Sequence, residues 1–402
     1  TLAEVFREAG YATLSVSSVP FSGQMTNLHQ GFEQLHERSS ISEGGSKTAR
    51  EYVDRLLPWL ATHREVPFFV FLHVFDPHDP FEPRKPFNTL WASAERGEEH
   101  KKQMEDLKKF IKRPFMKRRA LPNDEELKKS GLDREAFLSQ LHDWYDGSIR
   151  GMGAEIERIL GQLRTLDLDD KTLIVFTSDH GEEFLEHGKM FHGQSVYGEL
   201  SNIPLIMHGA GMVPAGVQVD ETVQSIDIMP TILELSGLPV PEGIQGRSLV
   251  PFFKGSPPAR TASLALWQQG GEDSPPAQVG VAQSKVKWDR PAMSEKAVIP
   301  EGAGPGNESV ESIAFLKDGW KLIRNRKEGK GEPTYELFDH RNDPLDAKDL
   351  ADEKPDLVTQ LAADLEAFQQ KAWDAKLPPD SAGQKAMSKE ELERLRSLGY
   401  IQ

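Results

Sequence analysis

Asp179 and His180 are adjacent residues whose side chains could bind a metal ion together. They follow the apolar run 172–177, and Gly181 comes next. A chain that bends at a glycine can turn both side chains toward one cation, and carboxylate and imidazole are ligands of hard or borderline divalent metals. Taken alone, the tetrapeptide 178–181 is equally well explained as a polar turn that caps a helix.

His78 lies in a second polar cluster, within the range 76–80, after the apolar run 66–74. A histidine at this place could hold an anionic group or protonate a leaving alcohol. The alternative is a histidine that is hydrogen-bonded within a proline-rich turn, and this is the default for an isolated residue. The sequence pattern alone leaves both interpretations open.

The elements that would position these residues alternate between helix and strand. Helical patterns at 49–63 and 149–163 alternate with short apolar runs rich in strand formers at 66–74, 172–177 and 203–207. This order predicts an α/β fold with a mostly parallel central sheet sandwiched by helices. Because open α/β sheets bind ligands beyond the carboxyl ends of their strands, both polar clusters fall where a site is expected.

Composition narrows the class of protein further. The chain has 402 residues, 38% of them hydrophobic, and a formal net charge of -15. This charge argues against general nucleic-acid binding, so an anionic ligand would need a local positive site. The sequence has no cysteine and no apolar run near the length that spans a bilayer. It therefore offers no disulfide and no cysteine nucleophile of its own.

Several motifs in order along the chain resemble those of the sulfatases, within the alkaline-phosphatase superfamily. The string from Thr177 to Gly188, continued by 191–199 and 203–206, resembles the second signature region of that family. Further similar segments occur in family order, at 71–80, 225–233, 245–249, 319–324, 335–339, 343–344 and 349–351. The resemblance covers nearly the whole chain, and it implies a metal-dependent sulfuric ester hydrolase.

The resemblance assigns roles residue by residue. Asp179 and His180 match the family's metal-ligand pair, which implies a divalent cation, with Ca²⁺ expected first and Mn²⁺ or Zn²⁺ as alternatives. His78 matches the histidine near the bridging oxygen of the substrate. His192 falls where many sulfatases place a substrate-binding lysine, and Lys189 competes for that catalytic role.

His73 and His187 rank lower, as substrate-binding residues. His73 is near the end of an apolar run, where a hydrogen-bonded core histidine is as good an explanation.

The sequence also departs from the family pattern. A complete member has an N-terminal strand with paired acidic metal ligands and a nucleophile motif that begins with Cys or Ser, and neither is visible here. We expect these elements to precede Thr1, so that this chain alone is inactive. A Cys nucleophile would imply formylglycine and sulfate esters as substrates, whereas Ser or Thr would favour phosphate or phosphonate esters.

The expected ligand is thus a small sulfate ester or a sulfated glycan, and the expected location is periplasmic or secreted. A non-catalytic truncated binding module is the alternative from another class. Nothing in the sequence indicates an oligomeric state.

We expect a main domain over 1–255, with a basic helical insertion at about 84–140, and a smaller domain over 256–402 with terminal helices near 357–373 and 389–398. The segment 101–119 carries nine basic residues against Glu105 and Asp106. A solvated helical face explains it better than a lid that recruits polyanions.

Overall fold

The computed structural model describes residues 1–19, 22–37, 48–209, 211–253, 282–283, 288, 290–296, 310–327 and 331–375. The chain forms two compact units. The first consists of residues 1–75, 152–177 and 204–288, and the second of residues 76–151, 178–203 and 289–402.

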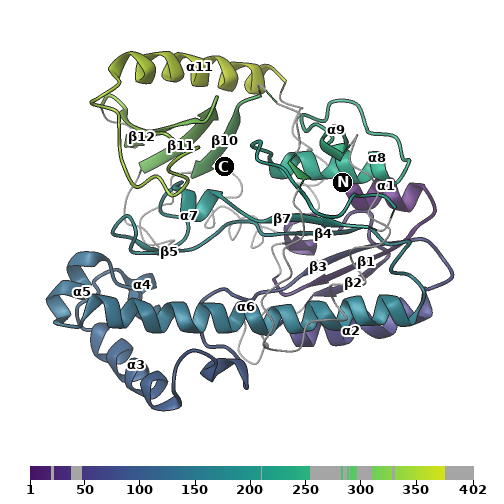
Figure 1. Cartoon of the computed structure of the whole chain (residues 1–402), viewed down its shortest axis with the longest axis horizontal. Coiled ribbons are helices and arrows are strands. Elements are labelled where there is room, and N and C mark those ends of the chain that lie inside the picture. Colours follow the sequence, from purple (N-terminus) through teal and green to yellow (C-terminus); the bar gives the residue numbers. More distant parts are fainter. Residues whose placement is uncertain are drawn as a thin grey trace. The chain divides into compact units, whose positions relative to one another are not determined.

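A parallel sheet in the order β2-β1-β3 is the centre of the first unit (Figure 1). Its strands are β1 (Ala12–Ser17), β2 (Gln34–Glu37) and β3 (Phe68–His73). Because side chains alternate along a strand, Leu14 of β1 and its partner Val70 of β3 share one face.

Helices cover both faces of this sheet. On the face of Leu14, the apolar side chains pack against α2 (Ala49–Thr62) and the last turns of α6 (Arg134–Thr165). On the other face, Phe6 of α1 (Leu2–Glu8) stacks on Phe69 of β3, with ring centroids 4.8 Å apart. Thr1 caps α1, since its hydroxyl accepts a hydrogen bond from the backbone of Glu4.

Two further strand pairs belong to the first unit. β4 (Ile174–Thr177) and β7 (Leu205–His208) pair antiparallel, and β8 (Val217–Gln218) pairs parallel with β9 (Ala282–Gln283). The remaining elements of this unit are η2 (Gln24–Thr26), η4 (Ser225–Asp227), α8 (Ile228–Leu235) and α9 (Val250–Phe253).

Helices form one part of the second unit. They are η3 (Phe87–Thr89), α3 (Ala94–Leu107), α4 (Pro114–Arg119), α5 (Asp124–Ser130) and the beginning of the 32-residue α6. Their apolar side chains share a core with the hairpin of β5 (Glu183–Phe184) and β6 (Met190–Phe191), which precedes α7 (Gly198–Ser201).

An antiparallel sheet in the order β10-β11-β12-β13 forms the rest of the second unit. Its strands are β10 (Ala292–Lys296), β11 (Val310–Lys317), β12 (Trp320–Lys327) and β13 (Thr334–Phe338). α11 (Pro355–Asp374) packs on this sheet, where Leu361 and Leu365 join the strand side chains in one core (Figure 1).

The predicted fold class is confirmed, because a parallel sheet flanked by helices is accompanied by a separate antiparallel C-terminal sheet. The helix expected at 149–163 is longer than predicted and begins at Arg134. The helix expected at 389–398 and the boundary at 255/256 lie outside the described residues. None of the helices in the described ranges is both long and apolar enough to cross a membrane.

Candidate active site

The β5–β6 hairpin brings three of the predicted residues together. It returns the chain after His180, so that the rings of His180 and His192 have centroids 4.0 Å apart. The ring of His78 lies 4.9 Å from that of His192. All three residues belong to the second unit. The structure therefore joins the two polar clusters of the sequence in one histidine cluster.

Asp179 and His180 present two donor atoms on the same side. The Nδ1–H group of His180 donates to the carbonyl of Gly181 at 2.7 Å, which leaves Nε2 with its lone pair. This Nε2 lies 3.7 Å from Oδ2 of Asp179, whose side chain is 75% exposed. One cation can contact both atoms, because metal bonds to nitrogen and oxygen ligands are roughly 2.0–2.6 Å long.

The donor set of this pair therefore fits a divalent cation but is incomplete. The described part of the chain contains no group of three or more His, Cys, Asp or Glu side chains that could hold a metal. Two ligands alone bind such an ion weakly, since Ca²⁺ takes about six to eight oxygen atoms.

Gly181 is required by a close approach of two chain segments. Its backbone N–H donates to the carbonyl of Leu200 at 3.0 Å. A Cβ atom at this position would lie 1.8 Å from the carbonyl oxygen of Glu199. Only glycine can therefore follow His180 while the backbone keeps this course.

His78 is surrounded by groups that favour its charged form. Its Nδ1 lies 2.9 Å from the carbonyl oxygen of Asp79 and 3.0 Å from the side-chain Oδ1 of the same residue. Burial lowers the pKa of His78, but the carboxylate of Asp79 outweighs burial, and the pKa lies above its ordinary value. Asp79 thus favours the protonated form of His78 more than water does for a free histidine.

His192 is surrounded by groups that favour its neutral form. Burial lowers the pKa of His192 to about 2. Its Nδ1 lies 3.1 Å from Oε1 of Glu182, and burial raises the pKa of Glu182 to about 8. A protonated Glu182 donates to Nδ1, so that Nε2 of His192 carries the hydrogen and acts as a donor.

Glu182 and Arg119 also contact this cluster, although the sequence pattern did not indicate them as site residues. Glu182 stands in the motif after Asp179 and His180, and its position there was the only signal in the sequence. Arg119 ends the basic segment 101–119, and its Nε lies 2.9 Å from Oδ2 of Asp79. Only the tertiary fold brings this arginine to the residue that follows His78.

Phe191, which precedes His192, adopts a backbone φ of 82°. Left-handed backbone costs a non-glycine residue on the order of 1–3 kcal/mol and is often found at functional sites. The Phe191 ring stacks on His192, with centroids 3.7 Å apart, and meets the edge of His78 at 5.6 Å. Its side chain thus contacts both histidines.

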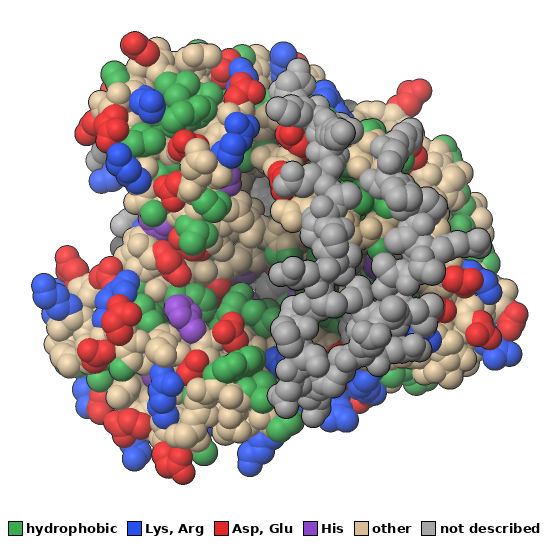
Figure 2. All heavy atoms as spheres, in the orientation of Figure 1, with side chains coloured by type: hydrophobic (Ala, Val, Ile, Leu, Met, Phe, Trp, Pro, Cys, Tyr) green, Lys and Arg blue, Asp and Glu red, His purple; other side chains and the backbone are tan. Residues whose placement is uncertain are grey.

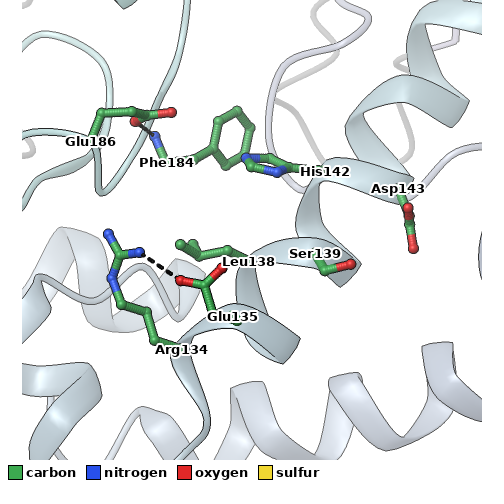
Figure 3. Close-up of a pocket in the computed structure, with 8 residues that line it drawn as sticks. All are labelled: Arg134, Glu135, Leu138, Ser139, His142, Asp143, Phe184 and Glu186. Atoms are coloured by element: carbon green, nitrogen blue, oxygen red, sulfur yellow. Dashed lines mark hydrogen bonds and ion pairs between the residues drawn. The ribbon is translucent and has the colours of Figure 1, made fainter. Parts of the chain in front are cut away.

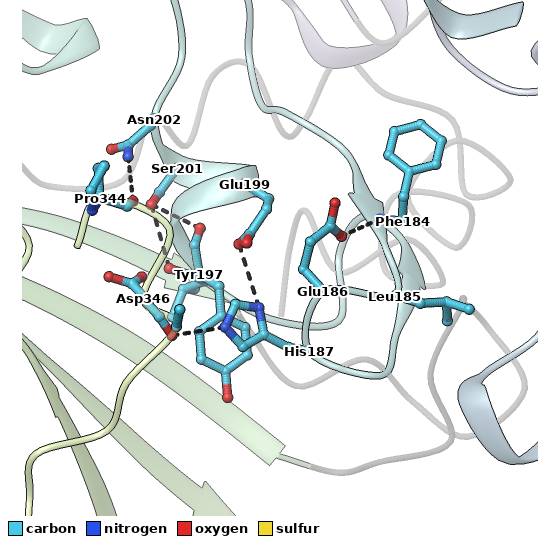
Figure 4. Close-up of polar contacts among 12 residues, drawn as sticks. Phe184, Leu185, Glu186, His187, Tyr197, Glu199, Ser201, Asn202, Pro344 and Asp346 are labelled. Carbon is cyan, nitrogen blue, oxygen red and sulfur yellow. Dashed lines mark hydrogen bonds and ion pairs between the residues drawn. The ribbon is translucent and has the colours of Figure 1, made fainter. Parts of the chain in front are cut away.

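The structure places His187 in a polar network rather than beside His192 (Figure 4). Its Nε2 donates to the backbone carbonyl of Asp346 at 2.9 Å, and its Nδ1 lies 3.5 Å from Glu199. Its ring stacks on Tyr197, with centroids 3.7 Å apart. These contacts hold the turn between β5 and β6 against the segment after β6 and against the loop that follows β13.

His73 and Lys189 also have partners of their own. His73 belongs to the first unit, where its Nδ1 lies 2.8 Å from the hydroxyl of Ser18. Lys189 donates to the carbonyl of Gln194 at 3.2 Å, and it lines a cavity of about 470 Å³ together with Tyr197 and residues of β11 to β13.

A second cavity, of about 370 Å³, lies at the beginning of α6 (Figure 3). Arg134, Leu138 and His142 of this helix line it, and Phe184 and Glu186 face them from the β5–β6 hairpin. It contains none of the predicted site residues.

Comparison with known proteins places the chain in a family. The sequence model of the family described as Sulfatase matches residues 1–238. Arylsulfatase K of Homo sapiens is 41% identical over 105 residues, which are 25% of this chain and 19% of the human protein. The Multifunctional alkaline phosphatase superfamily protein PehA of Trinickia caryophylli is 31% identical over 245 residues, 56% of this chain and 46% of that protein. The chain thus matches less than half the length of either relative.

Solved structures share the fold at low sequence identity. BT4656, in complex with its substrate D-glucosamine-2-N,6-O-disulfate, superposes with a TM-score of 0.65 at 19% identity, over 93% of this chain and 82% of that one. The phosphonate monoester hydrolase SpPMH from Silicibacter pomeroyi gives 0.63 at 18% identity, over 92% and 80%. Because the family model covers more than half of the sequence and the fold agrees, the chain belongs to the Sulfatase family.

Proposed function

We propose that the protein containing this chain is a metal-dependent hydrolase that cleaves sulfate esters through a covalent intermediate. The observation that carries the proposal is the pairing of His78 with His192 beside the exposed Asp179–His180 pair, in a member of the Sulfatase family. A protonated histidine and a neutral donor histidine next to a candidate cation site suit the transfer of a tetrahedral anionic group.

Asp179 and His180 are the proposed metal ligands. When bound, a divalent cation, with Ca²⁺ as the first candidate and Mn²⁺ or Zn²⁺ as alternatives, would supply positive charge to the sulfuryl oxygens and lower the pKa of the attacking hydroxyl. The exposed Oδ2 of Asp179 and the lone pair on Nε2 of His180 are the atoms that would contact it. The site needs additional ligands beyond this pair.

His78 and His192 have different proposed roles, proton donation and binding of the anionic group. His78, whose pKa Asp79 raises, is the proposed donor of a proton to the leaving alcohol, since a good general acid has a pKa near the working pH. His192, fixed by Glu182, offers Nε2–H to an oxygen of the anionic group and does not need to change its charge. Lys189 and His187 remain secondary candidates for contact with the substrate.

A formylglycine made from cysteine would have to come from outside the printed sequence, because the chain has no cysteine. The whole protein, rather than this chain, is therefore the proposed active species. Its proposed substrate is an aryl sulfate or a sulfated sugar, the latter by analogy with the disulfated glucosamine bound by BT4656.

Phosphonate or phosphate ester hydrolysis is the second candidate. Support comes from the similarity to PehA over 56% of this chain, and from the fold shared with a phosphonate monoester hydrolase. Sulfate, phosphate and phosphonate esters are all tetrahedral anions, so that the same histidines and metal ligands fit each of them.

The test is turnover by the full-length protein, matured and supplied with Ca²⁺. We expect release of 4-nitrophenol from 4-nitrophenyl sulfate at a higher kcat/KM than from 4-nitrophenyl phosphate or 4-nitrophenyl phenylphosphonate. A preference for either phosphorus ester would replace the proposal by the second candidate. Saturable binding of all three without turnover would indicate a non-catalytic binding protein.

A further inference from the structure

We propose that Arg119 determines substrate specificity by binding a second anionic group, a carboxylate or a sulfate, carried by the substrate next to the ester that is cleaved. This inference rests on the proposed function. Its basis is the way in which Arg119 is held, the atoms that it leaves unpaired, and its place beside the histidine cluster.

Arg119 is fixed in one orientation by three neighbours. Its Nε lies 2.9 Å from Oδ2 of Asp79, a residue that is only 4% exposed. The guanidinium carbon lies 4.2 Å from the ring centroid of Phe115 and 5.8 Å from that of Phe191. A guanidinium held in this way loses little conformational freedom when it binds a ligand.

The terminal nitrogens of Arg119 are available to a ligand. Among the described residues, neither Nη1 nor Nη2 has a hydrogen-bond or ion-pair partner, and the side chain is 29% exposed. Two parallel N–H groups of this kind match the two oxygens of a carboxylate or a sulfate.

Other cations of the same segment are already engaged. Arg113 pairs with Glu126 at 2.8 Å and also contacts Gln194. Lys108 and Lys109 pair with acidic neighbours on α3. Figure 2 shows Lys and Arg side chains interspersed with Asp and Glu over α3 to α5, at its lower left. Arg119 differs from these cations because its outer nitrogens have no partner among the described residues.

The position of Arg119 indicates which group it would bind. Asp79 contacts both His78 and Arg119, and the Phe191 ring contacts both Arg119 and His192. The guanidinium therefore lies beside the histidine cluster and shares neighbours with both histidines. A substituent next to the ester that the histidines would hold is the group that it would bind.

The net charge of -15 strengthens the inference. A substrate with two negative groups is repelled by the chain as a whole, so that its second charge needs a local cation. A bidentate, charge-assisted contact of this kind changes affinity by about 10- to 100-fold.

The test compares two aryl sulfates that differ in one charge, 3-carboxyphenyl sulfate and its neutral isostere 3-carbamoylphenyl sulfate. With the full-length protein, we expect Arg119→Met to lower the kcat/KM ratio of the first to the second by about 10- to 100-fold. Arg119→Met also removes the ion-pair partner of Asp79. We expect this change to alter kcat/KM for both substrates by the same factor, so that it does not change their ratio. An unchanged ratio would overturn the proposal.

Two variants serve as controls. Arg118→Met removes the same charge from an exposed neighbour, and we expect it to leave the ratio unchanged. Arg119→Lys keeps a positive charge beside Asp79 but lacks the planar fork, and it should show an intermediate ratio even if Arg119→Met does not fold. An Arg119→Lys ratio equal to that of the wild type would show that any nearby charge suffices and would refute the proposed fork geometry.

Failure of the proposed function is recognised separately. If the wild type hydrolyses neither sulfate, binding of the stable analogues 3-sulfobenzoate and 3-carbamoylbenzenesulfonate decides the question by calorimetry. Tighter binding of the first, lost in the Arg119 variants, would support the anion contact without the hydrolase. Equal binding of both analogues would overturn it.

Discussion

His78 and His192 face each other but differ in their electrostatic surroundings. Asp79 raises the pKa of His78 above its ordinary value, whereas burial lowers that of His192 to about 2. Two like charges 4.9 Å apart would repel each other, so that only one of these rings is expected to be charged at neutral pH. This difference assigns the proton to His78 and the neutral donor role to His192.

Replacing His78 by Ala should reduce kcat in a way that depends on the leaving alcohol. General acids contribute about 10²- to 10⁴-fold, and most to the departure of a poor leaving group. We therefore expect a large loss with alkyl or sugar sulfates and a smaller one with 4-nitrophenyl sulfate. A series of esters with alcohols of graded acidity measures this. Equal losses across the series would show that His78 is not the acid.

Asp79→Asn should shift the pH profile of the reaction. Asp79 raises the pKa of His78, so its loss lowers that pKa, and the required protonated form then disappears at a lower pH. The basic limb of kcat/KM against pH is expected to move toward acid, while the acidic limb should change little. A basic limb that stays in place would separate Asp79 from the proton-donating group.

At the scale of elements, the short apolar runs predicted the strands well. The helical pattern at 149–163 predicted only part of the long helix. The run 66–74 contains β3, and 172–177 contains β4, because few other elements accommodate so many β-branched and aromatic residues. α6 begins at Arg134, ahead of the predicted start at 149. Gly147 and Gly151 weaken the helical signal there, and tertiary packing overrides their low propensity.

Replacing two glycines of α6 by alanine should change the free energy of unfolding in opposite directions. At Gly147 a Cβ would lie 2.7 Å from the carbonyl oxygen of Phe87, whereas at Gly153 it would meet nothing within 4 Å. Gly153→Ala should raise the free energy of unfolding by about 0.5–1 kcal/mol, since alanine loses less backbone entropy in a helix. Gly147→Ala should lower it. Urea denaturation of the two variants tests both signs, and stabilisation by Gly147→Ala would contradict the packing described.

The packing of α3 against α6 should weaken in acid. His100 of α3 lies between Phe137 and Trp144, is 2% exposed, and neither ring nitrogen has a hydrogen-bond partner among the described residues. Burial, with a smaller effect of Arg96, lowers its pKa from 6.5 to about 4. The unfolded chain therefore binds the proton first, and stability present above pH 6.5 is lost as the pH falls toward 4.

The linked loss is on the order of 3 kcal/mol by pH 4. His100→Leu should remove this part of the pH dependence, so that the difference in unfolding free energy between variant and wild type grows from pH 7.5 to pH 4.5. A constant difference across this range would show that His100 does not titrate with unfolding.

At the scale of the whole molecule, the sequence motifs identified the family and most of the histidine cluster. Asp179, His180 and His78 could be placed because their motifs follow predictable strands, and His192 could be placed only from its position in the family's ordered motifs. Arg119 and Glu182 could not be assigned, because their roles depend on contacts with Asp79 and His192 that only the tertiary fold creates.

Metal binding should stabilise the folded protein as a whole. A ligand that binds only the native state adds about 2.7 kcal/mol at a concentration of 100 times its Kd. Saturating Ca²⁺ should therefore raise the Tm of the full-length protein, and a chelator should reverse the rise. Asp179→Asn and His180→Ala should abolish the response, whereas Arg118→Met should retain it. A Tm that does not change when Ca²⁺ is added would show that Ca²⁺ is not the cation.

Phe191 contacts several residues of this site, so that substitutions at these positions are expected to depend on one another. Its ring contacts His192, His78, Phe115 and Arg119, and its backbone holds a conformation that favours glycine. A substitution at 191 alters all four contacts at once, so single replacements during divergence would damage several of them together. Positions 115, 119 and 191 are therefore expected to covary among related sequences and to change as a set when substrate preference changes.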